Sequence, residues 1–366
     1  MVTESPWRRE TVARAALNAL WRMTPPSYRL DLEIGPANGQ AVAFKEGTLH
    51  ISEEVDLAAL PGLIRDQWWE VLAYKAQARD RRGRFARTGG GGGLSDAAYA
   101  KHRAKAENLL RKADSGGGST EAQYEHDPKR LGQYSPARAR QHEKILAGYE
   151  AEQAGVPATR QAIIMTGISG SGKTTSLARM PGVEMEGGKI KNYAVVDPDH
   201  FKTVLARRGL VPKIHGLSPM EASSLAHEES SHLAKRAGKR MMAKGKNVIW
   251  DITGSSEKSV AARISDLKAR GYKVTLGHVA VSVKTSRARV RQRHRRGVEA
   301  FLKGEGLGER VVPDSVIKDA EGPDGRNTRI DVFKNVRRKA DRSFLIDNEQ
   351  GAAVLVPSNK IASFIL

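Results

Sequence analysis

The sequence contains one stretch with the residue types and spacing of a phosphate-binding loop, RQAIIMTGISGSGKTTS at residues 160–176. An apolar run is followed by G-x-x-x-x-G-K-T and then by a helix-forming run, which makes a chance glycine-rich turn the weaker interpretation. Glycines let successive N–H groups face one anion, and the positive end of the next helix faces it too. We expect Lys173 to contact the phosphates of ATP or GTP and Thr174 to bind Mg²⁺. The expected nucleotide-binding residues are Gly167, Ser169, Gly170, Ser171, Gly172, Lys173, Thr174 and Thr175.

Two further apolar runs end in carboxylates, where parallel strands deliver residues to the ligand-binding edge of a sheet. The first run, YAVVD, ends at Asp197 and is followed by Asp199. One of the two is expected to cap the next helix, and we expect Asp199 to be the base that accepts the proton of an attacking hydroxyl. The second run, NVIWD, ends at Asp251, close to Thr253. We expect Asp251 to hold Mg²⁺ or to orient the acceptor.

The most basic segment of the chain follows a strand expected at residues 272–281. In a phosphotransferase, a lid at this position supplies arginines that neutralise charge on the transferred phosphoryl group. The alternatives are an exposed basic helix face and a contact with nucleic acid, because so many basic residues cannot all reach one phosphate. A separate arginine, Arg310, lies in a glycine-flanked loop. The segment contains Arg287, Arg289, Arg291, Arg293, His294, Arg295 and Arg296.

The overall composition excludes several kinds of site. The 366 residues include no cysteine, which excludes disulfides, thiolate metal sites and cysteine nucleophiles. No apolar run approaches the ~20 residues of a membrane span, and the start of the chain lacks the pattern of a signal peptide, so we expect a cytoplasmic protein. The net charge of +20 lies almost entirely after residue 157 and suits an anionic substrate or a nucleic acid.

These residues need alternating strands and helices to position them. The sequence therefore predicts an α/β fold, namely a P-loop NTPase-type kinase domain with a parallel sheet. A smaller α+β and helical N-terminal region with glycine-rich linkers precedes it. We expect helices at 7–23 and 57–78 and short strands at 28–34, 41–44 and 48–51. The predicted regions are a small α+β module at 1–80, a basic and glycine-rich linker with a short helix at 81–118, a helical connector at 119–157 and the kinase domain at 158–366.

Residues 158–356 resemble the zeta-toxin family of P-loop kinases, the toxins of epsilon/zeta-type toxin–antitoxin systems. The resemblance rests on GISGSGKTT, VVDPDHF and VIWDITG, an arginine in the lid helix and an arginine before V-P. It implies that a nucleoside triphosphate phosphorylates the 3′-hydroxyl of UDP-N-acetylglucosamine. By the same resemblance Asp199 is the base, Arg293 and Arg310 clamp phosphate, and Arg291 and Arg295 are alternatives to Arg293. Residues on the substrate side would be Asp197, Glu228, Asp251 and Thr253.

One departure from the family leaves the acceptor open. The best-known branch has a glutamate in an E-G-T sequence at the strand end, whereas this chain has Asp251-Ile252-Thr253. A second hypothesis is therefore a polynucleotide or other nucleic-acid kinase, and a third is a phage structural or docking protein that carries a kinase domain. The third rests on the basic, glycine-rich residues 79–93, which resemble segments of phage head-assembly proteins. Expected partners are an antitoxin protein, or helices within residues 95–155 that inhibit in cis.

Overall fold

The computed structural model describes residues 31–35, 42–45, 48–52, 94–125, 133–177, 182–187, 189–323, 325–351 and 353–364, with Val12, Ala58, Leu60, Ile64 and Met180 as single residues. The chain divides into two compact units. Unit 1 takes its described residues from 1–110, 203–223 and 294–310, and unit 2 takes them from 111–202, 224–293 and 311–366.

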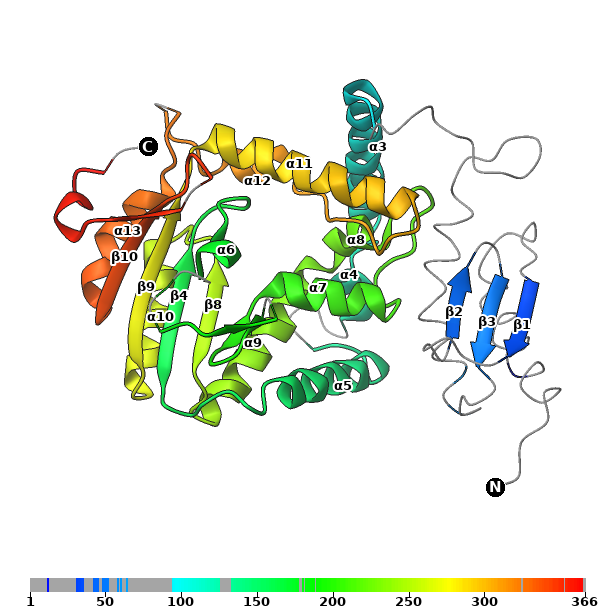
Figure 1. Cartoon of the computed structure of the whole chain (residues 1–366), viewed down its shortest axis with the longest axis horizontal. Coiled ribbons are helices and arrows are strands. Elements are labelled where there is room, and N and C mark those ends of the chain that lie inside the picture. Colours follow the sequence, from blue (N-terminus) through cyan, green and yellow to red (C-terminus); the bar gives the residue numbers. More distant parts are fainter. Residues whose placement is uncertain are drawn as a thin grey trace. The chain divides into compact units, whose positions relative to one another are not determined.

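Unit 2 is built on a six-stranded sheet in the order β11-β10-β9-β4-β8-β7. Figure 1 labels its four central strands, β10, β9, β4 and β8. All neighbouring strands pair in parallel except β11, which is antiparallel to β10. The predicted α/β fold with a parallel sheet is therefore confirmed. The strands are β4 (Gln161–Thr166), β7 (Ala194–Val196), β8 (Val248–Ile252), β9 (Lys273–Ala280), β10 (Arg342–Asp347) and β11 (Val354–Val356).

One face of this sheet is covered by the helices α9 (His227–Ala243), α10 (Glu257–Ala269) and α13 (Arg329–Val336). Each of these helices is the last long helix before the next strand, and right-handed crossovers from β7 to β8, from β8 to β9 and from β9 to β10 place all three on the same side. Trp250 of β8 lies against Gly238 of α9, and the guanidinium of Arg263 lies 3.9 Å from the centre of its ring. On β9, His278 stacks on Phe333 of α13.

The opposite face carries a thinner cover. Its core consists of Ile163, Met165 and Ile249 from the strands, packed with Leu177 of the short helix α6 (Lys173–Leu177) and with Tyr193. The hairpin of β5 (Met185–Glu186) and β6 (Lys189–Ile190) follows α6. Strands covered on both faces must be apolar throughout, which explains the continuous apolar runs in the sequence.

Two helices precede the sheet in unit 2, α4 (Thr120–Tyr124) and α5 (Pro136–Glu152). α5 packs along α9 and buries Ile145 and Leu146 completely. The hydroxyl of Tyr149 donates to the carbonyl of Val195 at 2.9 Å, which ties α5 to β7. The segment predicted as a connector thus contributes core side chains to the unit that holds the sheet.

Unit 1 contains a small sheet of β1 (Asp31–Gly35), β2 (Val42–Lys45) and β3 (Thr48–Ser52), in the order β1-β3-β2. These strands overlap the three short strands predicted there. The predicted helices at 7–23 and 57–78 and the basic glycine-rich residues 79–93 lie almost wholly outside the described residues. Unit 1 also holds most of α3 (Asp96–Ser115) and all of α8 (Pro219–Ala222).

Two helices contribute residues to both units. α7 (Pro198–Arg207) belongs to unit 2 up to Lys202, and α11 (Val283–Leu302) belongs to unit 2 up to Arg293. A short helix, α12 (Asp314–Lys318), follows in unit 2. Within the part of the chain that the structure describes, no helix combines the length and apolarity needed to cross a membrane.

Candidate active site

The glycine-rich loop connects β4 to α6, as predicted. Gly170 and Gly172 have φ angles of +83° and +88°, a region that favours glycine. Neighbours also exclude a larger residue, because a Cβ on Gly170 would lie 2.9 Å from the carbonyl oxygen of Ser286, and one on Gly172 would lie 2.4 Å from Nδ2 of Asn348. The loop is therefore held in shape by its own conformation and by the chain packed around it.

The ammonium group of Lys173 lies between the loop and the end of β8. Its Nζ donates to the carbonyl oxygen of Gly167 at 2.7 Å and lies 3.4 Å from Oδ1 of Asp251. Both side chains are mostly buried, with 12% and 14% of their surface exposed. Thr174 and Thr175 lie at the start of α6, and both are exposed. The ammonium group predicted to bind phosphate and the carboxylate predicted to bind Mg²⁺ thus meet at neighbouring strand ends, because β4 and β8 pair directly.

The two acids after β7 have different surroundings. Oδ1 of Asp197 accepts the backbone N–H of Asp199 at 2.9 Å, so Asp197 caps α7, whose first residue is Pro198. The carboxylate of Asp199 is about one-third exposed and lies 3.4 Å from Nζ of Lys202, whose own side chain is buried. The capping role falls to Asp197, and the side chain of Asp199 stays accessible for chemistry.

Most arginines of the basic segment hold neighbouring chain segments. Arg287 pairs with Glu321 at 3.0 Å, and Arg291 pairs with Asp314 of α12. The guanidinium of Arg289 donates to the carbonyl oxygens of residues 348 and 349. In unit 1, Arg295 contacts Asp96 and Glu299.

The helix face that touches the phosphate loop is the face of Arg293. Ser286 donates to the carbonyl oxygen of Ser169 at 2.5 Å, and Val290 lies against Gly170. Arg293 follows these residues by seven and three positions, so it continues the same stripe of α11. The assignment of Arg293, and not Arg291 or Arg295, as the arginine that clamps phosphate stays a prediction.

Residues 149–360 match the family model described as zeta toxin. The chain belongs to the zeta toxin family. Similar solved structures include AvrRxo1-ORF1 with AvrRxo1-ORF2 and sulphate ions (21% identity, 65% of this chain and 76% of that chain, TM-score 0.47) and the same pair with ATP (22%, 65% and 75%, 0.48). A structure of the PezAT toxin–antitoxin system of Streptococcus pneumoniae is also similar (15%, 62% and 82%, 0.40). No curated protein matches this chain.

Other residues that the resemblance to zeta toxins assigned stay predictions. Arg310 belongs to unit 1 and is half-buried. Glu228 is exposed on the first turn of α9, and burial together with the carboxylates of Glu125 and Glu228 raises the pKa of Glu121 on α4. Thr253 is exposed just after β8.

Sequence reasoning missed two residues of this zeta toxin family protein, one that supports the phosphate loop and one that supports the helix packed on it. The side-chain amide of Asn348 donates to the carbonyl oxygen of Ser171 at 2.7 Å. The carboxylate of Glu349 accepts hydrogen bonds from Ser282 and Thr285 at the start of α11. Both follow β10 directly, and the polar run Asp-Asn-Glu after the apolar residues of this strand was the available signal.

A large cavity in unit 2 lies away from these residues. It has a volume of about 780 Å³ and is lined where strands begin, by Gln161, Thr275 and Arg342 among others. Ligands of open α/β sheets bind at the opposite, carboxyl ends of strands. The chemistry of the residues, and not the size of a cavity, therefore marks the candidate active site.

Proposed function

We propose that this zeta toxin family kinase transfers the γ-phosphoryl group of ATP or GTP, with Mg²⁺, to a hydroxyl of a nucleotide sugar. The acceptor implied by the family resemblance is the 3′-hydroxyl of UDP-N-acetylglucosamine. The observation that carries the proposal is the meeting of Lys173 and Asp251 beside the glycine loop, 3.4 Å apart. These opposite charges pair with each other, and each would have its own ligand in the complex, phosphate for the lysine and Mg²⁺ for the aspartate.

On the nucleotide side, the loop N–H groups and Lys173 would hold the β- and γ-phosphates. The hydroxyl of Thr174 and the carboxylate of Asp251 are oxygen ligands, which is the donor type that Mg²⁺ requires. A bound Mg²⁺ would neutralise charge that develops on the phosphate oxygens. Arg293 would contribute further positive charge from the loop-facing stripe of α11.

On the acceptor side, Asp199 would take the proton of the sugar hydroxyl as its oxygen forms a bond to the γ-phosphorus and the bond to the β-phosphate oxygen breaks. Lys202 would orient this carboxylate, since its ammonium lies 3.4 Å from Oδ1. Asp197 fixes the start of α7 and so sets the position of the base.

The contacts of the basic segment support a small acceptor over a nucleic acid. Within the described residues, Arg287, Arg289, Arg291 and Arg295 are each engaged with carboxylates or backbone carbonyls. A surface that binds nucleic acid needs arginines that can reach phosphates. Phosphorylation of a polynucleotide is therefore treated as the alternative outcome of the test below.

The test is incubation of the full chain with ATP or GTP, Mg²⁺ and a panel of nucleotide sugars, nucleosides and oligonucleotides, with mass analysis of the products. We expect UDP-N-acetylglucosamine to gain one phosphoryl group. Lys173→Ala should lower kcat on the order of 10²–10³-fold, as loss of a charge-stabilising donor does. Asp199→Asn should lower kcat about 10²–10⁴-fold, as loss of a general base does.

Asp266→Asn is the matched control, because this exposed carboxylate on α10 pairs with Arg270 near the end of its own helix. It should retain full activity. A wild type that phosphorylates oligonucleotides but no nucleotide sugar would replace the proposed acceptor with a nucleic acid. Equal activity of Asp199→Asn and the control would remove Asp199 from its proposed role.

We further propose, from membership of the zeta toxin family, that a separate antitoxin protein binds this chain. Growth arrest on expression of the wild type and not of Lys173→Ala, relieved by one co-expressed protein, would support this. Inhibition in cis by helices within residues 95–155 stays a prediction. Its test should spare α5, because Leu146 and Tyr149 are core residues whose deletion would unfold the unit.

A further inference from the structure

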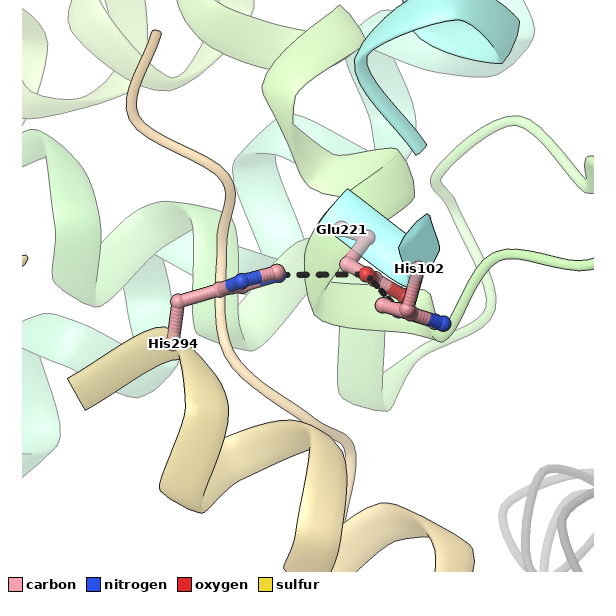
Figure 2. Close-up of side chains that lie close together, drawn as sticks. All are labelled: His102, Glu221 and His294. Atoms are coloured by element: carbon pink, nitrogen blue, oxygen red, sulfur yellow. Dashed lines mark hydrogen bonds and ion pairs between the residues drawn. The ribbon is translucent and has the colours of Figure 1, made fainter. Parts of the chain in front are cut away.

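Three side chains from distant parts of the sequence meet in unit 1. Figure 2 shows His102 of α3 and His294 of α11 converging on the carboxylate of Glu221 in α8. Nε2 of His102 lies 2.7 Å from Oε1 of Glu221, and Nε2 of His294 lies 3.1 Å from the same oxygen. Glu221 and His294 are almost completely buried, whereas the side chain of His102 is 26% exposed.

The ionic partners of Glu221 among the described residues are the two imidazoles, and no described lysine or arginine is paired with it. Burying a carboxylate is costly unless it is paired or coordinates a metal. Within the described part of the chain, this is the group of three histidine and carboxylate donors whose ligand atoms all lie within 4.8 Å of one another.

The surrounding residues orient these donors as outer ligands orient a metal site. The hydroxyl of Tyr99, one turn before His102 on α3, lies 3.1 Å from Nδ1 of His294, so Nε2 of that ring is the atom directed at the cluster. The second carboxylate oxygen of Glu221 accepts the backbone N–H of Ser218 at 2.8 Å. Such partners fix ring orientation and carboxylate position in metalloproteins.

We propose that His102, Glu221 and His294 form a binding site for a divalent transition metal ion of the zinc class. Two imidazole nitrogens and one carboxylate oxygen are a donor set that zinc uses, with bonds of about 2.0–2.2 Å and water in a fourth, tetrahedral position. The present donor separations must open slightly to admit the ion, and the partly exposed His102 provides the path of entry.

The donor types separate this site from the magnesium ligands proposed at the phosphate loop. Imidazole suits Zn²⁺, Co²⁺ and Ni²⁺, whereas Mg²⁺ takes oxygen ligands almost exclusively. A bound ion would join α3, α8 and the second part of α11, three segments of unit 1 separated by 73 to 119 residues. The proposed site would therefore cross-link segments of unit 1 and would take no part in phosphoryl transfer.

The test is titration of the metal-stripped full chain with Zn²⁺, followed by calorimetry and by metal analysis after gel filtration. We expect one equivalent per chain, bound in an excess of Mg²⁺. His102→Ala should lose this equivalent, and its partial exposure makes a folding defect the least expected among the three ligands. His215→Ala is the matched control, since His215 is an exposed histidine of the same unit, and it should bind as the wild type does.

Two further measurements distinguish a metal site from a buried hydrogen-bonded cluster. Co²⁺ in place of Zn²⁺ should give the visible absorption of a tetrahedral complex, absent from Glu221→Gln. Tyr99→Phe should weaken Zn²⁺ binding about tenfold, because it removes only the partner of Nδ1.

Failure of the wild type to retain Zn²⁺ through gel filtration would overturn the proposal and leave a structural cluster. The proposal would also be overturned if folded His102→Ala, judged by circular dichroism, retained one equivalent, or if His215→Ala lost it.

Discussion

Two buried glutamates eight residues apart, Glu221 and Glu229, have different hydrogen-bonding partners. Each lies in a different unit, each is at most 1% exposed, and each accepts a hydrogen bond from a histidine that precedes the phosphate loop. Burial opposes ionisation of both, yet hydrogen bonds from their partners lower the pKa of each to about 2. The partners differ, because Glu229 also receives the two-pronged guanidinium of Arg138, at 2.6 and 2.7 Å.

Because of this difference, Glu229 forms a complete ion pair, whereas Glu221 belongs to a site that can bind a ligand. The fork of Arg138 supplies a permanent charge that matches the carboxylate of Glu229 in geometry. Around Glu221 the partners are imidazoles, which carry a charge only when protonated and which otherwise offer lone pairs to a metal. A buried glutamate is thus part of a permanent ion pair on α9, whereas the one on α8 has partners that could instead bind a metal ion.

The largest effect is expected at the cluster with the fixed charge. Glu229→Ala removes the carboxylate that pairs with the buried guanidinium of Arg138, and we expect the free energy of unfolding to fall by about 3–5 kcal/mol. Urea denaturation measures this loss. The control is Glu228→Ala, an exposed neighbour that should stay within about 0.5 kcal/mol of the wild type. Similar losses for the two variants would contradict the structural role of Glu229.

The next largest effect on stability is expected when Zn²⁺ binds, and it should depend only on the cluster around Glu221. At a Zn²⁺ concentration 100 times its Kd, the free energy of unfolding should rise by about 2.7 kcal/mol. Glu221→Gln should abolish this rise. Arg138→Lys, which alters only the Glu229 cluster, should keep it. Thermal denaturation with and without Zn²⁺ compares the three proteins, and a rise retained in Glu221→Gln would break the distinction.

A smaller effect is expected from pH near the Glu229 cluster. Burial, together with the electrostatic influence of Arg236 and His142, lowers the pKa of His232 from 6.5 to about 4. The unfolded chain therefore binds more protons than the folded one between pH 6.5 and 4, and stability falls as the pH falls through this window. The slope contributed should be well below ~1.4 kcal/mol per pH unit, because His232 is only half-buried. Urea titrations of His232→Gln at pH 7 and 4.5 should show a flatter dependence than those of the wild type.

The smallest effect is expected for the metal-free protein on loss of the Tyr99 hydroxyl. Tyr99→Phe removes one hydrogen bond to His294, and the free energy of unfolding should fall by about 0.5–1.5 kcal/mol. Addition of Zn²⁺ should widen the gap to the wild type, because the variant also binds the ion less tightly. A gap that stays constant would mean that Tyr99 supports the helix packing alone.

The sequence predicts those features that are local in the chain. The runs that became β4, β7 and β8 are apolar throughout because helices or loops cover both faces of the sheet, and each run ends beside residues with evident chemistry. The glycine loop and Lys173 lie within eight positions of each other, so their spacing alone indicates their place. The cap role of Asp197 was one of two alternatives, which only the hydrogen bond to Asp199 distinguishes.

The features that the sequence did not predict depend on distant segments. His102, Glu221 and His294 come from three helices, and no short motif links them. Asn348 reaches the carbonyl of Ser171 across 177 residues. Nothing in its own neighbourhood shows that β10 ends beside the phosphate loop, because strand order becomes known only with the fold.

The dipeptide Asn348-Glu349 sets a limit for the design of a minimal catalytic fragment. Its amide holds the phosphate loop and its carboxylate holds the first turn of α11, so both the loop and the helix packed on it depend on residues that follow β10. A shortened protein that stops at β9 would keep every residue of the glycine motif and lose the chain that shapes it. Truncation boundaries, purification tags and fusion partners at this end therefore belong after β11 and not before it.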